Sequence, residues 1–250
     1  LLNALRAVHP PEPPPPSPQD IVAKDLAAAA QLAARKQWSE AEDLYRDALQ
    51  KSPHDATVLF AMGQALTEQR EWRQAITVYR RGLDIEPSNG QAHAALARLL
   101  EQNSDPAGAA SEYQQAVRLD PQDAESYSHL ANLLEQGGNL HGVIGAERAL
   151  IQLRPHDAGV HKRLGLALYL NSDLDGAVTE FRKAIEITPR DAEALNDLGD
   201  ALVASGDREA ALKAYYQASL AAPDQSTLKT EYQTLIEGLN PRGSTKVGPK

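Results

Sequence analysis

Residues 155–189 read PHDAGVHKRLGLALYLNSDLDGAVTEFRKAIEITP, and the spacing of this stretch recurs along most of the chain. Prolines return at intervals of 34 residues, and two positions after each comes Asp, Asn or, once, Gln. Proline cannot continue a helix, whereas Asp and Asn accept hydrogen bonds from the free amides of a helix that begins. The interval therefore predicts that one helix ends and another begins at Pro53, Pro87, Pro121, Pro155, Pro189 and Pro223.

A second break lies 16 residues before each of these prolines. Four of its six residues are good helix N-caps, and Pro106 follows one of them at the first helical position, where proline is tolerated. We expect Asp20 to cap the first helix of the series. Each period thus predicts two helices and no strand, with the inner break at Gln37, Glu71, Asp105, Asn139, Asp173 and Asp207.

Six repeats result when the period is counted from residue 22. The eighth and twentieth positions hold small residues with one exception at the twentieth, the eleventh always holds leucine, and the twenty-fourth is aromatic in five repeats. We expect the small residues to let two helices approach closely, and the aromatic ring to fill the space between neighbouring repeats. A single repeat cannot bury its apolar face alone, so the repeats must stack. Their ranges are 22–55, 56–89, 90–123, 124–157, 158–191 and 192–225.

This pattern resembles the tetratricopeptide repeat family, whose repeats share the small eighth and twentieth residues, the aromatic twenty-fourth and the proline at the thirty-second position. The resemblance implies an all-α, right-handed superhelical solenoid of antiparallel helix pairs. The first helix of each pair would line a concave groove. Proteins of this family are typically scaffolds that hold peptides or other proteins.

The fourth repeat departs from the pattern. Glu147 replaces the aromatic residue, Leu150 replaces a small one, and Gly142 and Gly145 loosen the second helix. A carboxylate at a packing position is costly unless it is solvated or paired. We therefore expect a shifted helix or a local irregularity in this repeat, and we expect it to be the least stable.

The two ends of the chain differ from the repeats. Residues 1–21 are rich in proline and predict an extended linker, or a ligand for a proline-binding module. Residues 226–240 predict a C-terminal capping helix, and 241–250 a basic, flexible tail. We expect a soluble domain, cytoplasmic by default. An extracytoplasmic or membrane-tethered location stays open if an N-terminal signal or anchor was removed.

Composition argues against several classes of function. The net charge of −9 disfavours nucleic acid as the main partner, and no apolar run is long enough to span a membrane. The chain has no cysteine, phosphate-binding loop or nucleophile elbow. His156, Asp157 and His161 could be imagined as metal ligands, but we favour a structural role for them. We expect no catalytic, cofactor or metal site.

Family geometry would place six positions of each repeat on the groove: the second, fifth, sixth, ninth, twelfth and thirteenth. We expect Arg98, Lys162 and Arg163 to form a basic island there for an anionic group. The alternative is that Lys162 and Arg163 pair with Glu135, Asp197 or Asp200 as a surface network, or that the whole face is merely solvated. The partner-binding candidates are Leu26, Phe60, Gln64, Arg98, His129, Asn132, Lys162, Arg163, Tyr169 and Asn196.

The sequence therefore predicts a non-catalytic adaptor that binds a peptide segment or a partner protein in the groove, within the assembly of a larger complex. A second hypothesis is an accessory module of a membrane-associated secretion, export or photosynthetic assembly machine, tethered through the proline-rich N-terminus. Self-association also stays open.

Overall fold

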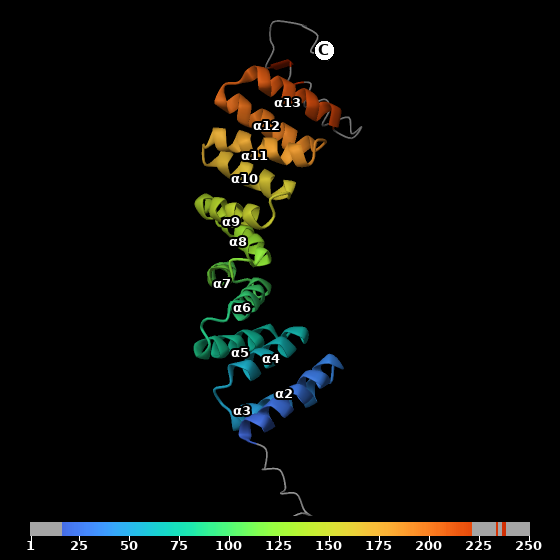
Figure 1. Cartoon of the computed structure of the whole chain (residues 1–250), viewed down its shortest axis with the longest axis vertical. Coiled ribbons are helices and arrows are strands. Elements are labelled where there is room, and N and C mark those ends of the chain that lie inside the picture. Colours follow the sequence, from blue (N-terminus) through green and yellow to red (C-terminus); the bar gives the residue numbers. More distant parts are fainter. Residues whose placement is uncertain (1–16, 222–233, 235–236, 239–250) are drawn as a thin grey trace, which may run out of the picture. The chain divides into compact units, whose positions relative to one another are not determined.

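The computed structural model describes residues 17–221, together with residues 234, 237 and 238 (Figure 1). Twelve helices occupy residues 17–221, and none of the described residues lies in a strand. The helices are α2 (Pro18–Ala34), α3 (Trp38–Lys51), α4 (Ala56–Glu68), α5 (Trp72–Ile85), α6 (Gly90–Gln102), α7 (Pro106–Leu119), α8 (Ala124–Gln136), α9 (Leu140–Leu153), α10 (Ala158–Leu170), α11 (Leu174–Ile187), α12 (Ala192–Ser205) and α13 (Arg208–Ala221).

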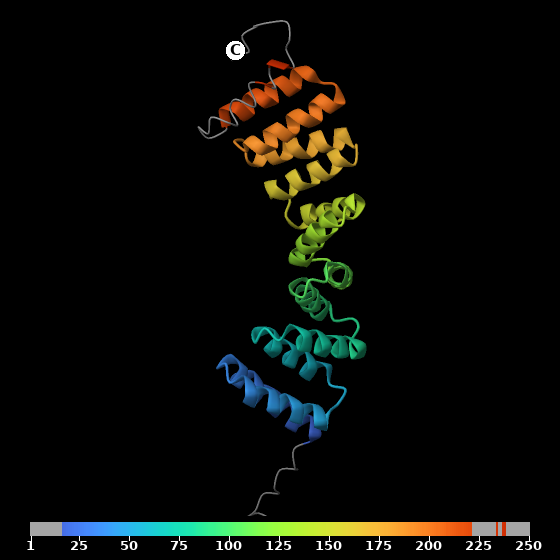
Figure 2. The same cartoon turned by 180° about the vertical axis from the view of Figure 1, so that it is seen from behind.

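The helices pack as consecutive pairs, and each pair is one 34-residue repeat (Figures 1 and 2). Short connections between the two helices of a pair make them antiparallel neighbours. The chain divides between Leu119 and Asp120 into two compact units. The N-terminal unit contains α2 to α7 and the C-terminal unit contains α8 to α13. Residues 1–16 of the proline-rich segment, most of the predicted capping helix 226–240 and the predicted tail 241–250 lie outside the described residues.

The first helix begins earlier than the sequence indicated. Ser17, not Asp20, is its N-cap, and Pro18 takes the first helical position. The Ser17 side chain accepts a hydrogen bond from the Asp20 amide at 3.2 Å, and the Asp20 carboxylate accepts one from the Ser17 amide at 2.9 Å. This reciprocal arrangement satisfies two amides that would otherwise lack partners at the helix start. Residues 18–21 are therefore helical rather than extended.

The caps predicted at the other breaks are confirmed. After each proline from Pro53 to Pro189, the Asp or Asn side chain accepts a bond from the backbone of the next helix. At the inner break the four good capping residues do the same, whereas Gln37 and Glu71 make no such bond. Pro106 opens α7 as expected. Side-chain chemistry thus sets most of the helix starts.

The turn inside each repeat uses one backbone conformation that the sequence did not reveal. The fifteenth residue has a positive φ in all six repeats, although only two of the six are glycine. The next amide donates to the carbonyl of the leucine at the eleventh position, at 2.8–2.9 Å in every repeat. This bond closes the end of the first helix and turns the chain into the second. The fifteenth residues are Lys36, Arg70, Ser104, Gly138, Ser172 and Gly206.

The aromatic twenty-fourth residue packs inside its own repeat. A Cβ atom added to Gly165 would lie 2.8 Å from the Phe181 ring, and one added to Gly199 would lie 2.5 Å from the Tyr215 ring. In these repeats the ring closes the space between its own two helices, a contact that we had not expected. The small eighth residue is needed because the ring, rather than a second backbone, comes close to it.

The fourth repeat keeps its second helix despite the substitutions. Helix α9 runs unbroken from Leu140 to Leu153, and Asn139 caps it through the Gly142 amide at 3.0 Å. Glu147 is nonetheless fully buried, where other repeats bury an aromatic ring. The two glycines cost about 1 kcal/mol each relative to alanine. Helix α9 is therefore formed but weakly supported.

We expect the amides of residues 141–152 to exchange with solvent before those of residues 175–186 in α11. The reason is that α11 has Phe181 at the position of Glu147 and Thr179 at the position of Gly145, whereas Gly176 matches Gly142. Native-state hydrogen exchange followed by mass spectrometry measures this order. Equal protection of the two helices would contradict the expectation.

Candidate functional site

Three of the six predicted groove positions are mostly exposed on the first helices, and the other three are mostly half-buried. The second and thirteenth residues are exposed in all six repeats, and the ninth is exposed in the first five. We call the surface formed by the second, fifth, sixth, ninth, twelfth and thirteenth residues the first-helix face.

In the N-terminal unit, two candidates serve the core as well as the surface. Leu26 is partly buried and packs against a cluster of buried residues that includes Ala29 and Tyr45. The Phe60 ring covers Gly82, where an added Cβ atom would clash with it, and stacks with Tyr79 at a centroid distance of 6.0 Å. Phe60 is thus explained by packing within its own repeat. Gln64 and Arg98 are exposed on the same face.

In the C-terminal unit, Lys162 and Arg163 of α10 are paired within the chain. The Lys162 ammonium lies 2.6 Å from Glu193 and 3.4 Å from Asp191, both near the start of α12. Arg163 Nη2 lies 2.5 Å from Glu147 Oε1 in α9. The two cations therefore belong to networks between repeats, and the predicted basic island is not supported here. Their partners also differ from the three carboxylates that we had considered.

The Glu147–Arg163 pair is the main electrostatic feature of the fourth repeat. Glu147 has no exposed surface, whereas the Arg163 side chain is 37% exposed. The two groups are close enough for a hydrogen bond, but neither Glu147 oxygen has one that is well aligned. Burial raises the pKa of Glu147 to about 7; Arg163 opposes this rise, and the charges of Glu135 and Asp157 add to it.

Helix α12 carries a concentration of carboxylates on the first-helix face. Burial raises the pKa of Asp197 to about 6, and the nearby charges of Glu193 and Asp200 contribute to the rise. Asp200 accepts a hydrogen bond from the Tyr215 hydroxyl at 2.5 Å and another from the candidate residue Asn196 at 3.4 Å. This end of the face is negatively charged and short of cations.

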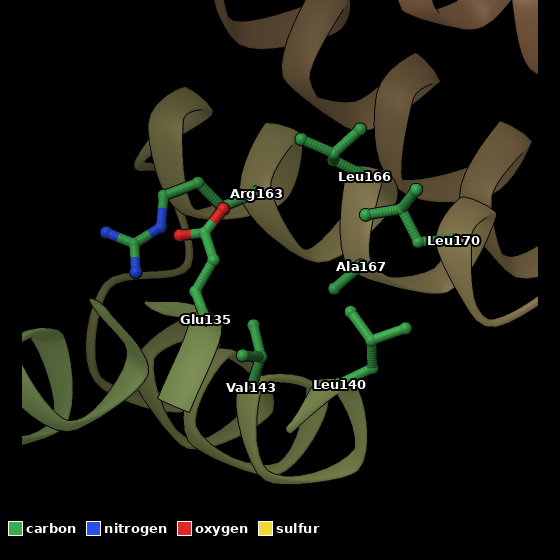
Figure 3. A pocket seen from close by; sticks show the side chains of 7 residues that line it. All are labelled: Glu135, Leu140, Val143, Arg163, Leu166, Ala167 and Leu170. Carbon is green, nitrogen blue, oxygen red and sulfur yellow. The ribbon is translucent and has the colours of Figure 1, made fainter. Parts of the chain in front are cut away.

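A small apolar pocket opens beside α10 (Figure 3). Figure 3 shows Leu166 and Leu170 facing Leu140 and Val143 across it, with Arg163 to one side. Leu166 is 39% exposed and Leu170 is 56% exposed. The space measures about 30 Å³, which admits the end of an aliphatic side chain but not an aromatic ring. Glu135 and Ala167 complete the lining.

Sequence reasoning found only part of this pocket. Arg163 was a candidate and Leu170 stands at the thirteenth position, which was placed on the groove, but Leu166, Leu140 and Val143 were missed. The sequence does mark Leu166, because the ninth position is leucine only in the fifth repeat. No sequence pattern indicates that Leu140 and Val143 of α9 line the pocket, because this depends on how the fourth and fifth repeats pack. Of the remaining candidates, Tyr169 is half-buried on α10, while His129 is half-buried and Asn132 exposed on α8.

The histidines at the fourth position have structural partners. His161 Nδ1 lies 2.6 Å from Glu180 Oε2 and its Nε2 lies 3.1 Å from the Pro155 carbonyl oxygen. His93 repeats this arrangement with Glu112 and Pro87 at the same two distances. Each histidine therefore ties the preceding loop to the second helix of its repeat.

Neither a metal centre nor a membrane span emerges from residues 17–221. No three His, Asp or Glu side chains among them gather in a way that could hold a metal ion. None of their helices combines the length and the apolar character needed to cross a membrane.

Sequence profiles described as tetratricopeptide repeat match residues 32–99, 94–158 and 192–225, and one described as TPR repeat matches 165–206. Together these matches span nearly all of the helix pairs. The chain is a member of the tetratricopeptide repeat family. Its fold of tandem helix pairs is the fold of that family, whose members are in general interaction scaffolds.

Solved structures with this fold resemble the tetratricopeptide chain at low sequence identity. The crystal structure of YrrB, described as a TPR protein with an unusual peptide-binding site, aligns with a TM-score of 0.63 and 19% identity, covering 76% of this chain and 97% of that one. The crystal structure of MamA protein aligns at 0.56 and 24%, covering 71% and 95%. The structure of Naa15/Naa10 bound to HypK-THB contains a chain that aligns at 0.68 and 18%, covering 87% of this chain and 34% of that one. No curated protein sequence matches significantly.

Proposed function

We propose that this protein is a non-catalytic scaffold that binds an extended segment of another protein on its first-helix face, within the assembly of a larger complex. The observation that carries the proposal is the apolar pocket beside α10, with Leu166 and Leu170 exposed at its edge. Large apolar side chains that gather on a helix face at a depression are typical of a binding surface.

The rest of the first-helix face supports the same function. Its side chains project from helices whose backbone amides are already bonded, so the scaffold is ordered before a ligand arrives. Binding of an extended peptide to such a surface therefore costs little free energy for reorganising the protein. The net charge of −9 and the internal pairing of Lys162 and Arg163 both disfavour a nucleic-acid backbone as that ligand.

Position-dependent photocrosslinking tests the proposal. A photoreactive phenylalanine analogue replaces Tyr169 on the first-helix face of the full chain or, as the matched control, Arg182, which is exposed on the second helix of the same repeat. In cells that naturally make the protein, we expect an adduct with another protein from position 169 and none from position 182. Equal adducts from both positions, or an adduct that consists of two copies of this chain, would overturn the proposal.

A further inference from the structure

The charge pattern of the first-helix face in the C-terminal unit indicates the chemistry of the segment that binds there. Both cations of α10 already have carboxylate partners within the chain. Lys162 holds Glu193 and Asp191, and Arg163 holds Glu147. An anionic ligand would have to compete with these carboxylates for each cation, so the surface is not built for one.

Other carboxylates of α12, by contrast, lie close to further carboxylates. Asp197 lies among Glu193, Asp200 and Asp191, and Lys162 is the cation that acts on it. Burial is the main cause of the raised pKa of Asp197, and the like charges of Glu193, Asp200 and Asp191 add to it, because like charges at short range destabilise one another. A cation supplied by a partner would relieve this repulsion. A positively charged group that binds at α12 is therefore favoured electrostatically.

The acidic and apolar parts of the face adjoin each other. Helices α10 and α12 are in contact, and the Lys162 ion pairs bridge them. Burial and the hydrogen bond to Asp200 raise the pKa of the Tyr215 hydroxyl, and Tyr169 of α10 is close enough to add to this rise. The surface thus passes from Leu166 and Leu170 over Tyr169 to the α12 carboxylates.

We propose that this α10–α12 surface, formed by Leu166, Tyr169, Leu170, Asp197 and Asp200, binds an extended peptide segment that carries an aliphatic side chain and, nearby, a Lys or Arg. The aliphatic group enters the pocket beside α10 and the cation pairs with Asp197 and Asp200. The pocket lies between α9 and α10, whereas the carboxylates stand on α12, so at least one helix spacing separates the two groups. Packed helices lie about 8–10 Å apart and an extended chain advances about 3.3 Å per residue, so the two groups are at least about three residues apart. The inference rests on the proposed function, because it specifies the ligand of the same face.

The first experiment selects ligands from a phage-displayed library of random peptides on the full-length protein. We expect the enriched peptides to combine a Leu, Ile or Val with a Lys or Arg at least about three residues away. Enrichment of acidic or uncharged peptides that still require Leu170 would overturn the cationic ligand but leave the proposed function in place. Failure to enrich any peptide that depends on this face would overturn both.

The second experiment measures the affinity of one enriched, fluorescently labelled peptide by anisotropy, at a pH well above the pKa of Asp197. Asp197→Asn removes a charge without changing the shape, and we expect it to weaken binding about tenfold while leaving the melting temperature unchanged or higher. We expect Leu170→Ser to weaken binding by a similar factor, whereas Ile85→Ser, at an exposed aliphatic residue of the N-terminal unit, should have no effect.

Two controls on the peptide complete the test. Replacing its Lys or Arg by Glu should abolish most of the binding to the natural protein, and should matter much less for the Asp197→Asn variant. Rising salt should weaken binding of the original peptide, because the charges are partly exposed. Unchanged affinity of the Asp197→Asn variant, or a charge-reversed peptide that binds as well as the original, would overturn the inference.

Discussion

Gly165→Leu is expected to lower the free energy of unfolding by about 3 kcal/mol, because the Phe181 ring occupies the space that the new side chain needs. A Cβ atom alone would already lie 2.8 Å from the ring, closer than real Cβ contacts allow. Both residues are buried, so the ring can move only by separating α10 from α11. Urea denaturation monitored by circular dichroism measures the loss.

Gly145→Leu is the matched control, since it makes the same substitution in the second helix of the preceding repeat. Nothing lies within 4 Å of the place where a Cβ atom of Gly145 would stand. Leucine forms helix better than glycine, so this variant should gain up to about 1 kcal/mol. If both variants lost the same stability, the close approach of Gly165 and Phe181 would not be the cause.

Arg163→Met is expected to cost about 3 kcal/mol at a pH above the pKa of Glu147. The substitution keeps the apolar stem of the side chain but leaves the buried Glu147 carboxylate without its counter-charge. The figure is at the lower end for a broken buried pair because Arg163 is partly exposed. Chemical denaturation of the natural protein and the variant, repeated over a range of pH, measures this cost.

The pH dependence follows from the direction of the Glu147 shift. The folded-state pKa, about 7, is above the ordinary value of 4.5, so the folded protein binds this proton more tightly than the unfolded chain. The stability that protonation contributes is fully present below 4.5 and is lost as the pH rises through about 7. In Arg163→Met the pKa of Glu147 rises further. The variant should therefore approach the natural protein in acid and fall away from it in alkali.

Lys162→Met tests whether the effect belongs to the buried pair. Lys162 precedes Arg163 on the same helix and also bridges two repeats, but its nearer partner, Glu193, is exposed. Exposed pairs contribute about 1 kcal/mol or less, so this variant should lose little at any pH. Equal losses for the two variants, or a loss in Arg163→Met that does not change with pH, would contradict the assigned role of Glu147.

The order and most of the boundaries of the helices followed from the sequence, because they depend on neighbours within a few residues. A proline ends a helix wherever it stands, and an Asp or Asn caps the amides two or three residues ahead of it. The breaks at Asp55, Asp105 and Asp191 were therefore predicted correctly. The start at Ser17 was missed, although the spacing of Ser17 and Asp20 is itself a local capping signal.

The side-chain partners could not be read in the same way, since they depend on which helices meet. Lys162 and Arg163 stand side by side in the sequence, yet one reaches forward to α12 and the other back to α9. Phe60 was predicted to face a ligand, but Gly82, 22 residues later, makes room for its ring. Such pairings connect residues that are far apart in the chain, so no local pattern marks them.

The sequence by itself thus determined the repeat, its two helices and the face that stays open to solvent, because short-range capping and helical periodicity decide all three. Only the tertiary structure decided the electrostatic character of that face. Packing of α9 against α10 pairs Arg163 with the buried Glu147, and contact of α10 with α12 pairs Lys162 with Glu193. Charges cancel according to distance in space and not along the chain, and a face that carries two adjacent cations in the sequence is therefore acidic and apolar in the fold.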